Sequence, residues 1–142
     1  MPLNIHIHKV QFYETDLMGI VHHSNYLRFF EEARVAWAVS RGILDYQKPE
    51  SASHLAVLET RVKHLKPAKF GDDLHVEIQA KIEKIRIIFE YKLFCQAKSA
   101  DAISECRTVH VALDENLRPI KPPHLLKTIL EKEKWIETWL SN

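Results

Sequence analysis

The sequence contains few of the residues that mark several functional classes. Its 142 residues contain only two cysteines and three glycines. The cysteines are too far apart to form the CxxC pair of a metal or redox site, and no G-x-S-x-G motif marks a serine-hydrolase nucleophile. Positive and negative charges nearly cancel, leaving a formal net charge of +1. We therefore expect no general attraction to nucleic acid or to an anionic membrane.

Long hydrophobic runs are also missing. No segment approaches the roughly 18 apolar residues that a membrane span requires, and the N-terminal segment MPLNIHIHKV lacks the apolar core of a signal peptide. We expect a cytoplasmic protein without a membrane span, in which both cysteines are reduced. Because no repeat, low-complexity run or Gly/Ser-rich linker divides the chain, we expect a single domain over residues 1–142.

Hydrophobic periodicity predicts one long helix near the start of the chain. From about residue 23 to 40, apolar side chains recur at the spacing of one helical face. They include Tyr26, Phe30, Ala33 and Trp37, which we expect in the core rather than around a cofactor. Gly42 follows this segment as a natural C-cap.

Alternation of apolar and polar residues, typical of strands, occupies most of the remaining chain. The expected strands cover residues of about 4–13, 55–65, 74–83, 85–96 and 102–113. A second helix is expected from about 124 to 140, after three prolines. One strand, one long helix and then four consecutive strands predict an α+β fold, whose antiparallel sheet would wrap around the long helix.

The two cysteines lie on the last two of these strands. If the connecting turn is centred on residues 100–101, Cys95 lies opposite Cys106 in the antiparallel pair. We therefore expect the two side chains to face each other as free thiols.

Two segments carry a family resemblance. The first, residues 12–34, combines Thr15-Asp16, Gly19, Ile20-Val21, His23, Asn25-Tyr26 and a Phe-Phe-Glu-x-Ala-Arg helix. The second, residues 65–74, contains a P-A-x-x-G-D turn. Together they resemble the 4-hydroxybenzoyl-CoA thioesterase-like family of hotdog proteins. Within that family the chain is most similar to the bacterial acyl-CoA thioesterases encoded with the Tol-Pal envelope system, although His22 stands where that subgroup often has Tyr.

The resemblance implies a hotdog fold, in which an antiparallel sheet wraps around one long helix and a further helix ends the chain. It also implies a hydrolase that cleaves the thioester of a short-chain or aromatic acyl-CoA without a cofactor. Similar proteins form homodimers, often paired into homotetramers, with their sites at the subunit interface. A sheet wrapped on one helix leaves its edge strands unpaired, which favours the same expectation.

Asp16 and His23 are the expected catalytic residues. In similar proteins the aspartate lies beside the thioester carbon and acts as nucleophile or general base. The backbone N–H at the position of His23 polarises the carbonyl there, as a helix N-terminus can. The His23 side chain could orient Asp16 or simply pack at the helix entry. From residue type alone, Asp16 would be a turn residue that accepts hydrogen bonds from backbone amides before Gly19.

The expected substrate-binding residues lie in the same motif and at one distant turn. They are Gly19, Val21, His22, Asn25, Tyr26, Lys84 and Arg86. Gly19 should have a positive φ or allow close approach of the ligand. Asn25 could also cap the helix or fix the Asp16 loop. Lys84 and Arg86 would attract the phosphates of CoA, and Lys63, Lys66 and Lys69 form a second basic group.

Other functions remain open at this stage. The chain has nine histidines, but none stands in the spacing of a zinc site, so we expect neither a metal nor a cofactor. A hotdog dehydratase acting on an acyl carrier would need a different placement of His and acid. A non-catalytic module that binds acyl-CoA or acyl carrier protein is the third possibility, and only kinetics can separate it from an enzyme.

Overall fold

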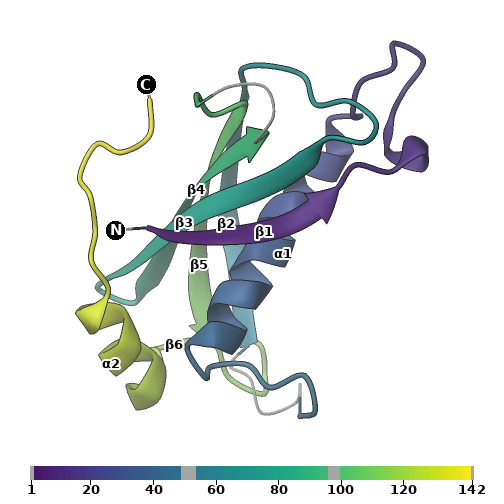
Figure 1. The fold of residues 1–142 in the computed structure, drawn as a ribbon. Helices are drawn as coiled ribbons and strands as arrows, with labels where there is room; N and C mark the ends of the chain where they lie inside the picture. Colours follow the sequence, from purple (N-terminus) through teal and green to yellow (C-terminus); the bar gives the residue numbers. More distant parts are fainter. Residues whose placement is uncertain (1, 49–53, 96–99, 142) are drawn as a thin grey trace.

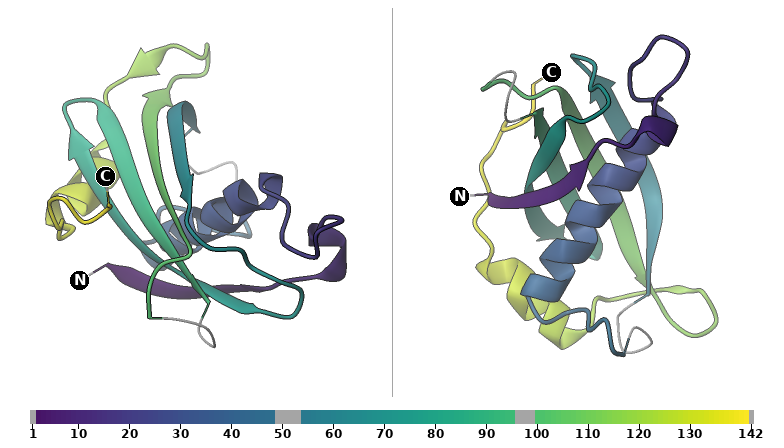
Figure 2. Two further views of the ribbon diagram at one scale, coloured as in Figure 1. Left: turned by 90° about the horizontal axis from the view of Figure 1, so that it is seen from above. Right: turned by 45° about the vertical axis from the view of Figure 1, so that its right-hand side comes forward.

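Six strands form one antiparallel sheet that curls around a single long helix (Figures 1 and 2). The computed structural model describes residues 2–48, 54–95 and 100–141. The strands are β1 (Leu3–Lys9), β2 (His54–His64), β3 (Asp73–Glu83), β4 (Arg86–Cys95), β5 (Ser104–Leu113) and the short β6 (Pro119–Ile120). The helices are α1 (Ser24–Ser40), α2 (His124–Lys132) and the 3-10 turn η1 (Phe12–Glu14). The strand order is β1-β3-β4-β5-β2, with β6 beside β5.

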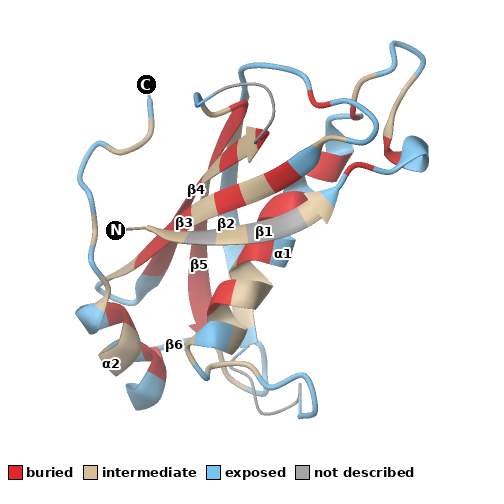
Figure 3. Cartoon of the chain, viewed as in Figure 1, coloured by how far each residue is buried: buried red, intermediate tan, exposed pale blue. Residues whose placement is uncertain are grey.

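The core lies between α1 and the concave face of the sheet (Figure 3). The predicted apolar face of the helix is buried, including Phe30, Ala33 and Trp37. Because side chains alternate across a strand, one face of β3 and β4 supplies the opposing apolar surface, with Val76, Ile78, Phe89 and Tyr91. The α+β class and the hotdog arrangement of sheet and helix are thereby confirmed.

The predicted register of the two cysteines is wrong. Cys95 lies opposite Leu74 on β3, whereas Cys106 lies opposite Tyr91 on β4. The prediction assumed a two-residue turn, but β4 ends at Cys95 and β5 begins only at Ser104, a longer connection that moves the register by four residues. An even displacement keeps side chains on the same face, so both cysteines are still buried, and both are free.

The second half of the predicted C-terminal helix is not helical. The α2 helix ends at Lys132, and Glu133 has an extended ψ of 138°. The Glu133 carboxylate accepts hydrogen bonds from Trp37 Nε1 at 2.8 Å and from Arg41 Nε at 2.8 Å. This anchor at the end of α1 directs residues 133–141, which we name the C-terminal strap, over the convex face of the sheet (Figure 1).

Polar partners on the sheet hold the strap and outweigh its helical propensity. The Gln79 side chain bonds both backbone groups of Ile136, donating to its carbonyl at 3.1 Å and accepting from its amide at 3.0 Å. Further along, the Ser141 amide donates to the Glu105 carboxylate at 3.0 Å. Two strap tryptophans cover lysines: Trp135 lies 4.5 Å from Lys81 Nζ and Trp139 5.0 Å from Lys92 Nζ.

A buried polar cluster joins α1 to the middle of the sheet. Arg34 donates to the Tyr91 hydroxyl at 3.1 Å, and that hydroxyl shares a hydrogen bond of 2.6 Å with Thr108 Oγ1. His110 Nε2 lies 2.8 Å from the same Thr108 oxygen. His110 is 1% exposed, and burial, followed by the charge of Arg34, lowers its pKa to about 4.

Candidate active site

A tight loop between η1 and α1 presents Asp16. The loop closes on itself through a bridge between Thr15 and Val21 and a hydrogen bond from the Asp16 amide to the Ile20 carbonyl at 2.9 Å. Gly19 turns the chain at φ 79°, a left-handed conformation that L side chains seldom adopt. The positive φ expected of Gly19 is confirmed.

The Asp16 carboxylate is half-buried and held from one side. Its Oδ1 accepts a hydrogen bond from the Met18 amide at 2.8 Å. Within the described ranges of the chain, Oδ2 has no hydrogen-bond partner. The turn-forming role of Asp16 is therefore real, but it uses one oxygen and fixes the direction of the other.

The P-A-x-x-G-D segment supports the loop from the side, which explains why the two motifs occur together. The Val21 amide donates to the Ala68 carbonyl at 2.8 Å, and Ile20 forms a bridge with Lys69. In return, the Ala68 amide donates to the Tyr26 hydroxyl at 3.3 Å. Tyr26 is thus buried beneath the site, where its hydroxyl bonds the Ala68 segment, and it is a core residue as expected.

Asn25 fixes the start of the loop. Its side-chain amide is buried and donates to the Glu14 carbonyl at 2.9 Å, which also accepts from the His22 amide at 2.8 Å. Of the two roles weighed for this residue, fixing the Asp16 loop is the one in the structure. The expected contact between Asn25 and substrate would therefore use the polar side-chain atoms that this hydrogen bond does not occupy.

The amide of His23 is the available donor at the start of α1. The amides of Asn25 and Tyr26 donate to the carbonyls of His22 and His23, and the Ser24 amide donates to His22 Nδ1 at 3.2 Å. In the part of the chain that the structure describes, the His23 amide has no acceptor. An unpaired amide at a helix N-terminus is suited to hold a carbonyl oxygen that gains negative charge.

A cavity of about 380 Å³ contains these groups. Its lining includes Asp16, Val21, His23, Tyr26, His64 and Lys66. His64, the last residue of β2, was not anticipated. Its only sequence signal is its place ahead of the P-A pair at the end of a poorly patterned strand, and partial burial, followed by the charge of His23, lowers its pKa.

Asp16 also borders a larger hollow of about 870 Å³ on the other side of its loop. Gly19, His22 and Asn25 line this second space. The rings of His22 and His23 lie with centroids 4.3 Å apart at an interplanar angle of 31°, and His22 lines the larger space while His23 lines the smaller one. Every expected site residue of the first motif therefore lies on one of the two cavities that share Asp16.

Lys84 and Arg86 lie at the opposite end of the sheet. They form the β3–β4 turn, where Lys84 has a positive φ of 59°, while the Asp16 loop docks beside Lys69, just before β3 begins. The length of β3 from Asp73 to Glu83 is about 33 Å at the usual rise per strand residue. One protomer therefore does not bring the basic turn to the carboxylate.

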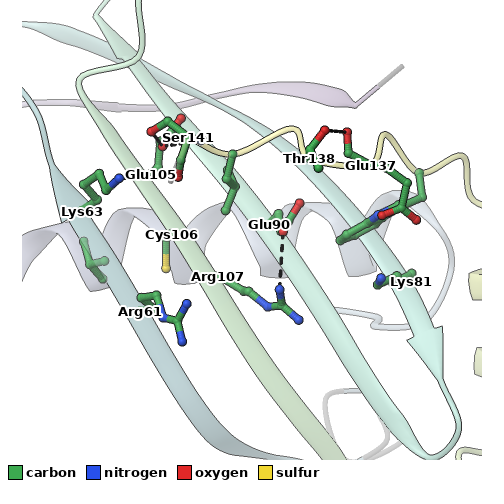
Figure 4. Close-up of a pocket in the computed structure, with 13 residues that line it drawn as sticks. Arg61, Lys63, Lys81, Glu90, Glu105, Cys106, Arg107, Glu137, Thr138 and Ser141 are labelled. Atoms are coloured by element: carbon green, nitrogen blue, oxygen red, sulfur yellow. Dashed lines mark hydrogen bonds and ion pairs between the residues drawn. The ribbon is translucent and has the colours of Figure 1, made fainter.

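Another cavity, of about 470 Å³, lies under the C-terminal strap on the convex face (Figure 4). It includes Lys63 but none of the expected site residues. Two of the three carboxylates that line it have partners: Glu90 pairs with Arg107 at 4.0 Å, and Glu105 with the strap and with Lys92 at 3.9 Å. The bond between Glu105 and Ser141 holds the strap to the sheet, whereas the two ion pairs join β4 to β5.

The described residues include no group of three or more His, Cys, Asp or Glu side chains that could hold a metal ion. Among those same residues, the helices are too short or too polar to cross a membrane.

The chain is similar to known proteins in both sequence and fold. The sequence model of the thioesterase-like superfamily matches residues 10–131. A protein of Aquifex aeolicus, provisionally named an esterase, is 34% identical over 112 residues, covering 78% of this chain and 84% of that protein. A 1,4-dihydroxy-2-naphthoyl-CoA hydrolase of Thermosynechococcus vestitus is 31% identical over 126 residues, 86% of each chain. The crystal structure of an Aquifex aeolicus protein superposes with a TM-score of 0.80 at 29% identity, covering 91% of this chain and 99% of that one.

Proposed function

Because the chain belongs to the thioesterase-like superfamily, we propose that it hydrolyses acyl-CoA thioesters with Asp16 as the attacking or base carboxylate. The acyl group is short or aromatic. An aromatic acyl-CoA is the substrate given in the name of the similar 1,4-dihydroxy-2-naphthoyl-CoA hydrolase. Within the superfamily we group it with the 4-hydroxybenzoyl-CoA thioesterase-like and Tol-Pal-associated enzymes. It acts in the cytoplasm as one domain over residues 1–142.

One observation carries this proposal: Asp16 and the start of α1 at His23 line the same cavity. The unpaired His23 amide donates a hydrogen bond to the thioester carbonyl oxygen and stabilises the negative charge that develops on it. Asp16 Oδ2 acts on the carbonyl carbon from the other side, directly or through water, because Met18 holds Oδ1. The C–S bond then breaks and the thiolate leaves.

A panel of acyl-CoAs tests the activity, with release of free thiol as the readout. Hydrolysis of at least one short or aromatic acyl-CoA is expected. Tight binding of every substrate without thiol release would instead identify a binding module. Loss of water from a 3-hydroxyacyl substrate with its thioester intact would identify a dehydratase.

We also propose that the active form is a homodimer or homotetramer paired through β2. This strand is an edge of the sheet, and Leu58 on it is 51% exposed. In an antiparallel two-fold pairing, the His64 end of one copy meets the His54 end of the other. The basic turn lies at the His54 end, because Arg86 is opposite Val111 and Val111 is opposite Ala56. A second copy would therefore bring its basic turn toward Asp16.

Sedimentation at micromolar concentration tests this pairing. We expect a dimer or tetramer for the wild type, and we expect Leu58→Asp to shift it toward the monomer by placing a charge on the shared edge. Leu125→Asp, at a leucine that is 62% exposed on α2, is the matched control and should keep the wild-type mass. A monomeric wild type would contradict the shared site.

The basic turn should affect substrate affinity rather than chemistry. Lys84→Asn removes the charge while suiting the left-handed backbone at this position, and we expect KM to rise about 2- to 5-fold, as for one exposed charge contact. The kcat should stay close to that of the wild type. Lys127→Asn on the exposed face of α2 is the control. A large fall in kcat at constant KM would mean that the turn belongs to the catalytic centre.

A further inference from the structure

His64 lies in the cavity of Asp16 although neither family motif contains it. It ends β2 opposite Ser104, on the concave side of the sheet. Its ring packs edge-on against Tyr26, with centroids 4.7 Å apart. Two segments that are distant in the sequence therefore meet at one cavity: the loop from Asp16 to His23 supplies a carboxylate and a helix amide, and the end of β2 supplies an imidazole.

Direct attack by Asp16 creates a requirement that Asp16 cannot meet. A carboxylate oxygen bonds to the acyl carbon, the C–S bond breaks, and the electron pair stays on sulfur as thiolate. Asp16 is then part of an anhydride and has no carboxylate with which to take a proton from water. Hydrolysis of such an intermediate at a useful rate needs another base at the same place.

We propose that His64 is this base, an inference that rests on the proposed role of Asp16 as nucleophile. Water attacks the acyl carbon of the anhydride and His64 takes its proton. The bond between the acyl carbon and the Asp16 oxygen breaks, which restores the carboxylate and releases the acid. His64 passes its proton to the thiolate, so that thioester and water give acid and thiol.

The surroundings of His64 suit proton acceptance. The ionisable groups that share its cavity are Asp16, His23, Tyr26 and Lys66. Partial burial, followed by the charge of His23, lowers the pKa of His64, so the imidazole is neutral at neutral pH and offers a lone pair. The ring of His23 packs at a tilt against that of His22, and His23 contributes its backbone amide.

Pre-steady-state thiol release from His64→Gln tests the assignment. Glutamine keeps a polar side chain of similar length but cannot take the proton. We expect a burst approaching one thiol per active site, followed by turnover about 100-fold slower than in the wild type. The slow phase should also lose the acidic limb of the pH profile that His64 gives to the wild type. His124→Gln, an exposed histidine at the start of α2, is the control and should match the wild type.

The outcomes separate this inference from the function on which it rests. Turnover of His64→Gln within about 2-fold of the wild type, or slow turnover without a burst, would overturn the role of His64. If His64→Gln gives either of these results and Asp16→Asn is inactive in the same assay, only the role of His64 is overturned and the proposed function stands. If Asp16→Asn is fully active, the proposed function fails as well.

Discussion

Replacement of Asp16 by Asn should lower kcat about 100-fold or more while the protein stays folded, in line with the loss of a catalytic carboxylate. Asparagine can still accept the hydrogen bond that the Met18 amide gives to Oδ1, so the loop keeps its shape. What disappears is the negative charge on the oxygen that faces the thioester. The measurements are kcat and KM with the best acyl-CoA, beside a thermal melt.

Asp45 provides a matched control for this substitution. Its Oδ1 accepts a hydrogen bond from the Gln47 amide at 2.8 Å, the same turn geometry that Asp16 forms with Met18. Asp45→Asn should leave kcat unchanged. If Asp16→Asn instead melts earlier and turns over normally, Asp16 is only a turn residue and the mechanism is wrong.

The stability of the fold should fall as the solution becomes acidic, and His110 should be the main cause. The pKa of His110 is lowered from 6.5 to about 4 in the folded protein. Between these two pH values the unfolded chain binds a proton at His110 and the folded protein does not. The contribution of neutral His110 to the free energy of unfolding is fully present above the pKa of the unfolded chain, and it is lost as the pH falls toward 4. Between about pH 7 and about pH 5, the free energy of unfolding should decrease by roughly 2 kcal/mol from this group.

Urea unfolding of His110→Gln at the two pH values isolates this contribution. Glutamine can bond Thr108 Oγ1 as His110 Nε2 does but does not titrate, so the variant should lose most of the acid dependence. His124→Gln should keep it, since His124 is exposed. An identical pH dependence in wild type and His110→Gln would assign the acid sensitivity to other groups.

The sequence was most informative where the determinants are local. The apolar stripe on α1 and the alternation along β3 and β4 each follow from a repeating pattern, and both were predicted correctly. The positive φ of Gly19 was also predictable, because a compact loop before a helix leaves few residues able to turn the chain. The catalytic role proposed for Asp16 rests on the family resemblance, since its residue type alone favours a turn.

The features that were missed or wrong depend on contacts between distant residues. His64 joins Asp16 only because the segment that follows His64 folds back onto the Asp16 loop, where Ala68 meets Val21. The cysteine register depended on the length of a connection that lacks glycine. The strap leaves the helix at Glu133 because its carboxylate finds Trp37 and Arg41, and no local pattern encodes such a meeting.

The strap also has a consequence for the behaviour of the protein in concentrated solution. A sheet face of long paired strands is a surface on which sheets from other molecules can stack. Here Trp135 and Trp139 lie across Lys81 and Lys92, so the convex face is already occupied and the tryptophans are partly shielded. Loss of the strap from the sheet would uncover the convex face and both indole rings in one step. Precipitation on storage should therefore follow local loss of the strap, well before the core between α1 and the sheet opens.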